Sequence, residues 1–197
     1  MSILDYMNIL GALEFKDSAF SGFQKALLKH DYGKSPEESF AWIACVLALN
    51  AASLGNLGVG AILVENDRVI VDACNEMFNP FYRSDGHPEM MVLTEFEFHH
   101  RRRMNSVTMY SSLEPCPMCL TRLTTTGIGE VKYIAAHPES GMSQFIDKLP
   151  PHWRQYGEDL NIKESACSIA LKTLSRDLLN ETVRRLMPSI LSRMGKS

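Results

Sequence analysis

Two stretches organise this sequence: His87-Pro88-Glu89, and Pro115-Cys116-Pro117-Met118-Cys119. Together they supply one imidazole and two thiols, at positions 87, 116 and 119, and these are side chains that bind zinc in proteins. A structural zinc site usually takes four protein ligands, whereas a catalytic site takes three and leaves a position for water. Glu89 follows His87 closely enough to act on such a water without being a ligand itself. The pattern therefore predicts a hydrolytic zinc site.

The two halves of this pattern are much more specific together than apart. A Cys-x-x-Cys pair alone can be redox-active, metal-binding or neither, and most His-x-Glu triplets are surface accidents. The alternative is that the cysteines are simply buried, His87 is a surface residue, and Glu89 only complements the positive end of a helix dipole. The order of the motifs and the 29 residues from His87 to Cys116 favour one metal site.

Length and composition indicate one soluble globular domain. The chain has 197 residues, of which 45% are apolar and 22% charged, and its formal net charge is −3. This charge provides no electrostatic signature for nucleic acid, so a nucleic-acid partner is possible but not favoured. We expect no membrane span and no signal peptide. Five cysteines at irregular spacing fit reduced thiols, so we expect a cytoplasmic protein.

Hydrophobic periodicity predicts helices at both ends of the chain. Residues 1–35 are interpreted as a helical extension that packs on a main domain at 36–197, and the function of the extension cannot be read from the sequence. Ser35-Pro36 opens a strong helix that ends near Gly55, with serine as N-cap and proline at the first helical position. A long amphipathic helix is expected to start at Ser165 and to stop at Pro188.

Five apolar runs between these helices read as strands. They are Val59–Val64, Val69–Ala73, Val107–Ser112, Val131–Ala136 and Leu160–Lys163. The polar turn between the first two predicts a hairpin. The connection between the last two is long and holds a helical stretch, which suits parallel pairing. Strands with helices between them predict an α/β layer fold.

Several residues keep two interpretations. Gly58 and Gly60 either let the backbone approach another element closely or merely punctuate a strand. The basic segment 99–103 is interpreted as cations at a helix C-terminus, with phosphate binding as the alternative. His137-Pro138-Glu139 is interpreted as loop, with a substrate contact as the less favoured alternative. The cluster around Trp153 suits stacking on a base, although such residues more often simply pack.

These motifs resemble the cytidine/deoxycytidylate deaminase superfamily, whose signature is H-x-E followed by P-C-x-x-C. The similarity runs from about Ala41 to Leu179 and is strongest to the branch of tRNA adenosine, guanine and cytosine deaminases. The resemblance implies a three-layer α/β/α fold with a five-stranded mixed sheet, one Zn²⁺ per chain and a homodimer. Where the family usually has alanine between the histidine and the glutamate, this chain has Pro88, which lacks an N–H.

The resemblance also implies roles for individual residues. His87, Cys116 and Cys119 would hold zinc, and Glu89 would be the catalytic acid and base. Asn75 would hydrogen-bond the substrate. The backbone around Gly60-Ala61 and Glu114-Pro115 would line the base pocket, and Trp153 is a further candidate contact.

The expected reaction is hydrolytic deamination of a small-molecule nucleobase, nucleoside or nucleotide. Zinc lowers the pKa of a bound water to about 7 in favourable sites. Glu89 would take a proton from that water and pass it to the ring nitrogen and the leaving amine, so that ammonia departs and an oxo group remains. Two alternatives stay open: a tRNA adenosine-to-inosine editing deaminase, and a non-catalytic zinc module that uses the fold for assembly.

Overall fold

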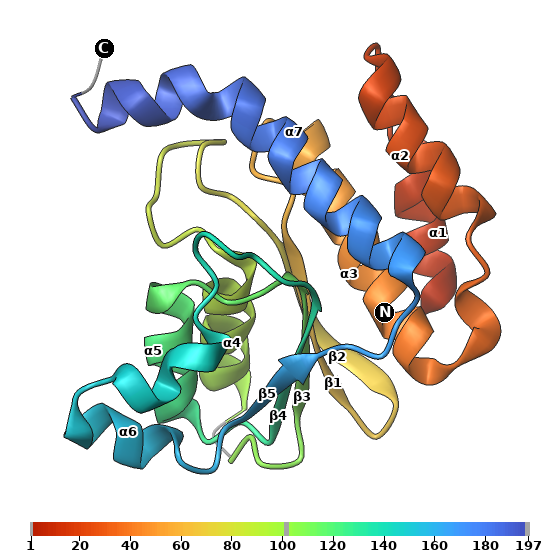
Figure 1. The fold of residues 1–197 in the computed structure, drawn as a ribbon. Helices are drawn as coiled ribbons and strands as arrows, with labels where there is room; N and C mark the ends of the chain where they lie inside the picture. The colour runs from red at the N-terminus through yellow and green to blue at the C-terminus, as the bar shows by residue number, and fades with distance from the viewer. Residues whose placement is uncertain (1, 101–102, 196–197) are drawn as a thin grey trace.

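A computed structural model describes residues 2–100 and 103–195 of the chain. Five strands form one mixed sheet in the order β2-β1-β3-β4-β5 (Figure 1). The strands are β1 (Gly60–Glu65), β2 (Arg68–Cys74), β3 (Thr108–Leu113), β4 (Glu130–Ala135) and β5 (Asn161–Glu164). β1 pairs antiparallel with β2 and β3, whereas the β3–β4 and β4–β5 pairs are parallel. The predicted fold class, the hairpin and the parallel last pair are thereby confirmed.

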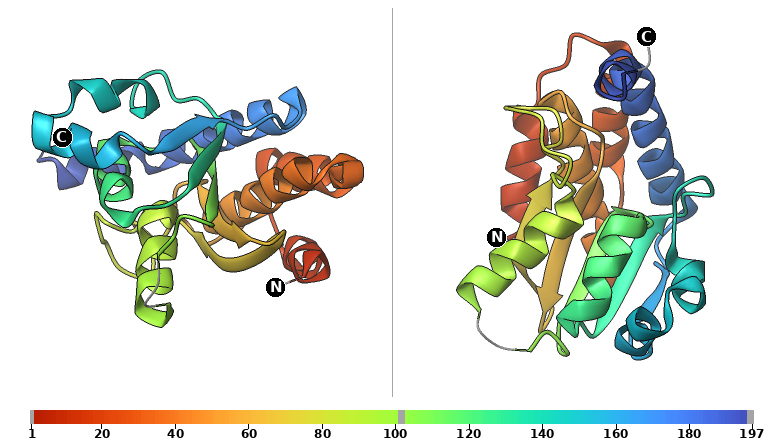
Figure 2. Two further views of the ribbon diagram at one scale, coloured as in Figure 1. Left: turned by 90° about the horizontal axis from the view of Figure 1, so that it is seen from below. Right: turned by 90° about the vertical axis from the view of Figure 1, so that its left-hand side faces the viewer.

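Helices cover both faces of the sheet, which makes a three-layer α/β/α architecture (Figures 1 and 2). One face carries α3 (Pro36–Ser53) and α7 (Ile169–Arg193), with α1 (Ile3–Ala12) and α2 (Ser18–Lys29) packed outside them. The other face carries α4 (Pro88–His99) and α5 (Pro117–Thr126), which lie side by side, with α6 (Pro151–Gly157) against α5. Two short 3-10 helices lie in the connections: η1 (Tyr32–Lys34) between α2 and α3, and η2 (Ser143–Lys148) between β4 and α6.

The continuous apolar run of β1 follows from its central position between two helical layers. Ile62 and Val64 belong to the core cluster that includes α3 and α7. Ala61 and Leu63 point to the other face and pack with residues of α4. Because both faces of this strand are covered, apolar residues occupy every position and do not alternate with polar ones.

The N-terminus of α3 connects three parts of the molecule. The Ser35 hydroxyl accepts a hydrogen bond from the Glu38 N–H, as expected of an N-cap. The Glu38 carboxylate then accepts from the Ser168 N–H at 2.8 Å and lies 2.6 Å from His30. These bonds join α3 to the end of α2 and to the start of α7.

The N-terminal helices share the core of the main layer. Tyr6 and Leu10 of α1 and Leu27 of α2 are fully buried in the same cluster as Trp42 of α3. The Trp42 indole N–H donates to the Leu27 carbonyl at 2.9 Å. The division at residue 35 remains a prediction.

The predicted bounds of the C-terminal helix were wrong. α7 begins at Ile169, capped by the Ser168 hydroxyl, and runs through Pro188 to Arg193. Pro188 is exposed, so water can replace the hydrogen bond that a proline removes from the helix. In the connection between β4 and β5, where a helical stretch was expected, the structure has η2 and α6.

In the basic segment 99–103, residues 101 and 102 lie outside the described part, while His99 pairs with Glu95 at 2.9 Å. Among the helices of the described part, none combines the length and the apolar character needed to cross a bilayer.

Candidate metal and active site

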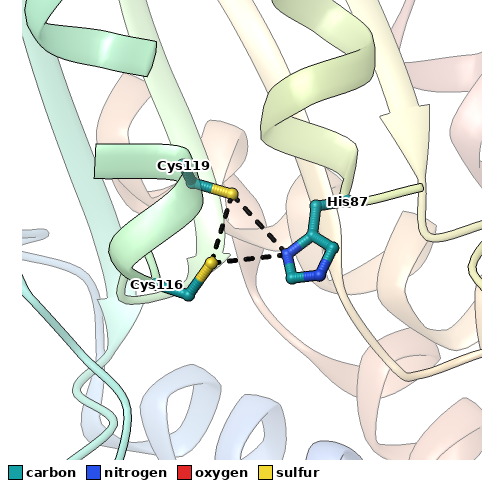
Figure 3. Close-up of side chains that lie close together, drawn as sticks. All are labelled: His87, Cys116 and Cys119. Carbon is teal, nitrogen blue, oxygen red and sulfur yellow. Dashed lines mark hydrogen bonds between the residues drawn. The ribbon is translucent and has the colours of Figure 1, made fainter. Parts of the chain in front are cut away.

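The three predicted ligands converge on one point between α4 and α5 (Figure 3). His87 Nδ1 lies 3.7 Å from Cys116 Sγ and 3.6 Å from Cys119 Sγ, and the two sulfurs are 3.6 Å apart. A tetrahedral zinc ion with ordinary Zn–S and Zn–N bonds would separate its sulfur ligands by about 3.8 Å, and sulfur from nitrogen by about 3.6 Å. The triangle of donor atoms therefore fits one Zn²⁺.

Helix ends place these ligands. His87 is the N-cap of α4 and Cys116 is the N-cap of α5, and each is followed by a proline at the first helical position. Proline costs nothing there, because that N–H has no partner within a helix. Cys119 lies one turn further along α5. Two positive helix ends thus face the site, and this favours thiolate ligands.

The two thiols share one proton. The hydrogen bond from Cys119 lowers the pKa of Cys116 to about 4, and the same bond raises the pKa of Cys119. Cys116 is therefore a thiolate at neutral pH. Cys116 and Cys119 would both hold a zinc ion in their deprotonated form, because only deprotonated sulfur is a ligand.

Glu89 lies beside the donor atoms in the first turn of α4. It is buried, with 3% of its surface exposed. One carboxylate oxygen accepts a hydrogen bond from the Ser111 hydroxyl at 2.9 Å, and the other lies 3.7 Å from Cys119 Sγ. Burial raises the pKa of this carboxyl, which brings it closer to neutral pH. Such a group can take up and return a proton.

A pocket of about 350 Å³ opens onto these residues. His87, Glu89 and Cys116 lie at its metal end, and Asn75 and Glu114 line it as well. The other lining residues are Leu57, Val59, Pro88, Leu113, His137, Glu139, Ser140, Leu179, Asn180 and Val183. Apolar walls with a few polar groups are typical of sites for small molecules.

The predicted substrate contacts are only partly gathered around this pocket. Asn75 and Glu114 line it. Gly60 and Ala61 are buried in β1 next to the lining residue Val59, and Pro115 is the buried residue between Glu114 and Cys116. Trp153 packs against Tyr156 on α6 and is not among the lining residues. The substrate roles of all these residues remain predictions.

Asn75 is held so that its amide can reach a ligand. The side-chain oxygen of Asn75 accepts a hydrogen bond from the Met77 backbone N–H at 3.0 Å, and the backbone N–H of Asn75 donates to the Val59 carbonyl at 2.9 Å. The amide nitrogen has no hydrogen-bond partner among the residues that the structure describes. It is therefore available to donate to a molecule in the pocket.

The glycines before and in β1 allow close packing. A Cβ at Gly58 would lie 2.7 Å from the Leu178 side chain, and one at Gly60 would lie 2.5 Å from the Ala44 carbonyl oxygen. Of the two interpretations, close approach is therefore the correct one. The consequence at Gly58 is that α7 comes near enough to line the pocket.

Sequence reasoning missed the contributions of β3 and α7. Ser111 could have been suspected as a polar residue inside an apolar strand. For Leu179, Asn180 and Val183 the sequence holds no signal, because only the packing of α7 brings them to the pocket.

Three histidine and cysteine ligands, a buried carboxylate and a small-molecule pocket on this sheet define a zinc hydrolase site. Residues 34–135 match the model of the cytidine and deoxycytidylate deaminase zinc-binding region, and the chain belongs to this family. It is 34% identical over 103 residues to a tRNA-specific adenosine deaminase of Bacillus subtilis (strain 168), a match that covers 52% of this chain and 63% of that protein. It is 31% identical over 102 residues to the chloroplastic tRNA(adenine(34)) deaminase of Arabidopsis thaliana, which covers 51% of this chain and 8% of that protein. The chain thus spans less than two thirds of these relatives.

Solved structures share the fold. A structure from a study of A-to-I editing by tRNA:A34 deaminases has a TM-score of 0.61 and 23% identity, and covers 72% of this chain and 99% of that one. A guanine deaminase from Nitrosomonas europaea has a TM-score of 0.55 and 17% identity, and covers 87% of this chain and 96% of that one. At such identities the likeness shows the fold alone.

Proposed function

We propose that this protein is a zinc-dependent hydrolytic deaminase that acts on a free nucleobase or nucleoside and releases ammonia. The observation that carries this proposal is the position of Glu89, a buried carboxylate 3.7 Å from one of the metal-ligand sulfurs. A zinc module that serves only assembly has no use for such a group. Burying a carboxylate costs free energy, and a module without catalytic activity gains no function from that cost.

Each residue has a defined task in this reaction. Bound zinc lowers the pKa of water to about 7 in favourable sites. Glu89 accepts a proton at the oxygen nearest Cys119 and returns it, first to the ring nitrogen and then to the leaving amine. The Ser111 hydroxyl holds the other oxygen at 2.9 Å and keeps the carboxylate directed at the reacting atoms. Asn75 donates its amide N–H to the substrate.

The charges around the pocket support an uncharged substrate. The described residues that line it include no lysine or arginine, whereas Glu114 and Glu139 add two carboxylates besides Glu89. Among these described lining residues a phosphate would find no lysine or arginine to pair with, and the acidic groups would repel it. A base or nucleoside is therefore favoured over a nucleotide.

A second candidate is tRNA adenosine deamination, which the similarity to the Bacillus subtilis enzyme favours. An RNA-editing enzyme has to contact phosphates, and its binding weakens steeply with salt. Salt-dependent binding of tRNA would distinguish this candidate. We also propose a homodimer, as the family resemblance implies, and sedimentation velocity of the zinc-loaded protein tests it.

The decisive experiment is an ammonia-release assay on cytosine, adenine, guanine, their nucleosides and tRNA. The wild-type protein should release ammonia from at least one free base or nucleoside. Glu89→Gln should keep one zinc per chain by elemental analysis and lose about 10²- to 10⁴-fold or more in turnover. Glu95→Gln, an exposed residue of the same helix, is the matched control and should keep full activity. No ammonia from any substrate, or full activity of Glu89→Gln, would refute the proposal.

A further inference from the structure

His137 lies on the loop that follows β4, and its backbone is held from both sides. Its N–H donates to a Glu114 carboxylate oxygen at 2.9 Å. Its carbonyl accepts from the N–H groups of Ser140 at 3.1 Å and Gly141 at 2.6 Å. The position of this residue in the pocket wall is therefore well defined.

Glu114 is committed to the same loop. Its second oxygen accepts from the Ser143 N–H at 3.0 Å and from the Ser143 hydroxyl at 2.5 Å. Gly141 packs directly against this carboxylate, and a Cβ there would require the Glu114 side chain to shift. Although Glu114 lines the pocket, its hydrogen-bonding capacity serves the loop. It acts as a positioning residue for His137.

The imidazole of His137, in contrast, makes no hydrogen bond within the described part of the chain. Its Nδ1 is buried and has no hydrogen-bond partner among the described residues, and no bond to the other ring nitrogen is found there either. Buried polar groups are nearly always paired, because an unsatisfied one costs free energy. His137 is nevertheless one of the residues that line the pocket together with His87 and Glu89. A ligand in that pocket is the natural partner.

The location outside the family match is also informative. The matching residues end at 135, so the matched region contains the metal ligands and Glu89 but not His137. The loop after β4 and α7 supply the pocket-lining residues that lie beyond the matched region. Substrate choice is set by such contacts to the ring, because a site built to hydrogen-bond a polar group rejects rings that lack it.

We propose that His137 determines substrate specificity by hydrogen-bonding a polar group of the bound heterocycle other than the amine that is removed. This inference rests on the proposed function. Neutral imidazole carries one donor and one acceptor, so it can pair with a ring nitrogen, an oxo group or a second amino group. His137 thus recognises the ring through a hydrogen bond, while Glu89 transfers protons to and from the amine that is removed.

The test measures binding separately from turnover. In zinc-loaded Glu89→Gln protein, calorimetry gives the Kd of cytosine, adenine, guanine and their nucleosides. Adding His137→Leu removes both nitrogens at similar volume and should weaken the best ligand about ten- to hundredfold, with less effect on the others. His137→Asn and His137→Gln place an amide near Nδ1 and Nε2 respectively, and one of them should restore binding to within a few-fold. In the active enzyme, the same substitutions should change kcat/KM ratios between substrates in parallel.

Controls separate specificity from folding. His152→Leu, on the exposed side of α6, should leave every Kd unchanged. Zinc content and Tm should match those of the parent protein. If His137→Leu does not fold, His137→Phe replaces it, since it keeps a ring and removes both nitrogens.

Two outcomes are distinguishable. The role of His137 is overturned if His137→Leu binds every ligand with the Kd of the parent protein. It is also overturned if His137→Leu, His137→Asn and His137→Gln all lose the same affinity. In both cases, turnover by the wild-type protein would still support the proposed function. No turnover of any substrate by the wild-type protein refutes the proposed function itself.

Discussion

Replacing Gly60 with alanine should destabilise this protein strongly, because β1 touches the backbone of α3 at this residue. A Cβ there would lie 2.5 Å from the Ala44 carbonyl oxygen, 2.6 Å from Leu47 Cβ and 2.7 Å from the Ala48 nitrogen. Ordinary contacts of a Cβ are 3.4–4 Å. Strand and helix would have to move apart by about 1 Å, because two of these atoms belong to the backbone and the third is a Cβ, whose position the backbone sets.

The magnitude follows from the cost of overpacking a core. Extra methyl groups in well-packed sites cost about 1–3 kcal/mol. We expect about 3 kcal/mol in the free energy of unfolding for Gly60→Ala, the upper end of that range, since three contacts are violated at once. For a chain of this size, 1 kcal/mol corresponds to about 2–4 °C in Tm, so Tm should fall by about 6–12 °C.

Thermal and urea unfolding of the zinc-loaded protein measure this effect. Gly22→Ala is the matched control, because Gly22 lies inside α2 and a Cβ there would meet nothing within 4 Å. Alanine in a helix interior is favoured over glycine by about 0.5–1 kcal/mol, so this variant should be slightly more stable than wild type. Equal stability of the Gly60→Ala and Gly22→Ala proteins would show that the close approach of β1 and α3 is not what requires Gly60.

Three further predictions follow. Cys116→Ala should lose zinc, and an unchanged metal content by elemental analysis would contradict its assignment as a ligand. Glu114→Gln should raise KM more than it lowers kcat, because an amide has one acceptor oxygen and cannot hold both ends of the loop. Glu139→Gln, at an exposed position in the same loop, should lower kcat/KM less than Glu114→Gln does. Equal losses of kcat/KM in the two variants would contradict the positioning role of Glu114. Burial raises the pKa of Glu38, but hydrogen bonds from Ser168 and the contact with His30 outweigh it and hold the pKa below its ordinary value. Glu38 therefore stabilises the fold above the unfolded-state pKa of about 4.3, and this contribution is lost as the pH falls below that value. In Glu38→Gln, the free energy of unfolding should depend less on pH below about 4.3 than in the wild type. The same pH dependence in both proteins would contradict this role of Glu38.

The sequence predicted the local features well, because their causes are local. Ser35-Pro36 caps α3, and the polar turn between two apolar runs makes the β1–β2 hairpin, through interactions within a few residues. The metal ligands could also be predicted, since the chemistry of zinc restricts its ligands to a few residue types.

The helix boundary at Pro188 shows where such reasoning fails. A proline inside a helix removes one hydrogen bond, and the sequence does not say whether water or neighbouring groups can replace it. In the structure Pro188 is exposed and α7 continues to Arg193. The same limit applied to Gly58 and Gly60. Gly58 is needed because α7 packs against it, and Gly60 because α3 does, and the sequence alone does not show these contacts.

By itself, the sequence determined the order of helices and strands, the set of zinc ligands and the acid beside them. Only the tertiary structure decided that Ser111 holds Glu89, that α7 lines the pocket, and that Glu114 fixes the loop of His137. It also showed that the His137 Nδ1 atom has no hydrogen-bond partner among the residues it describes. The physical reason is distance along the chain. Caps, turns and ligand motifs act within a few residues, whereas a pocket wall arises from packing between segments whose mutual position no short pattern encodes.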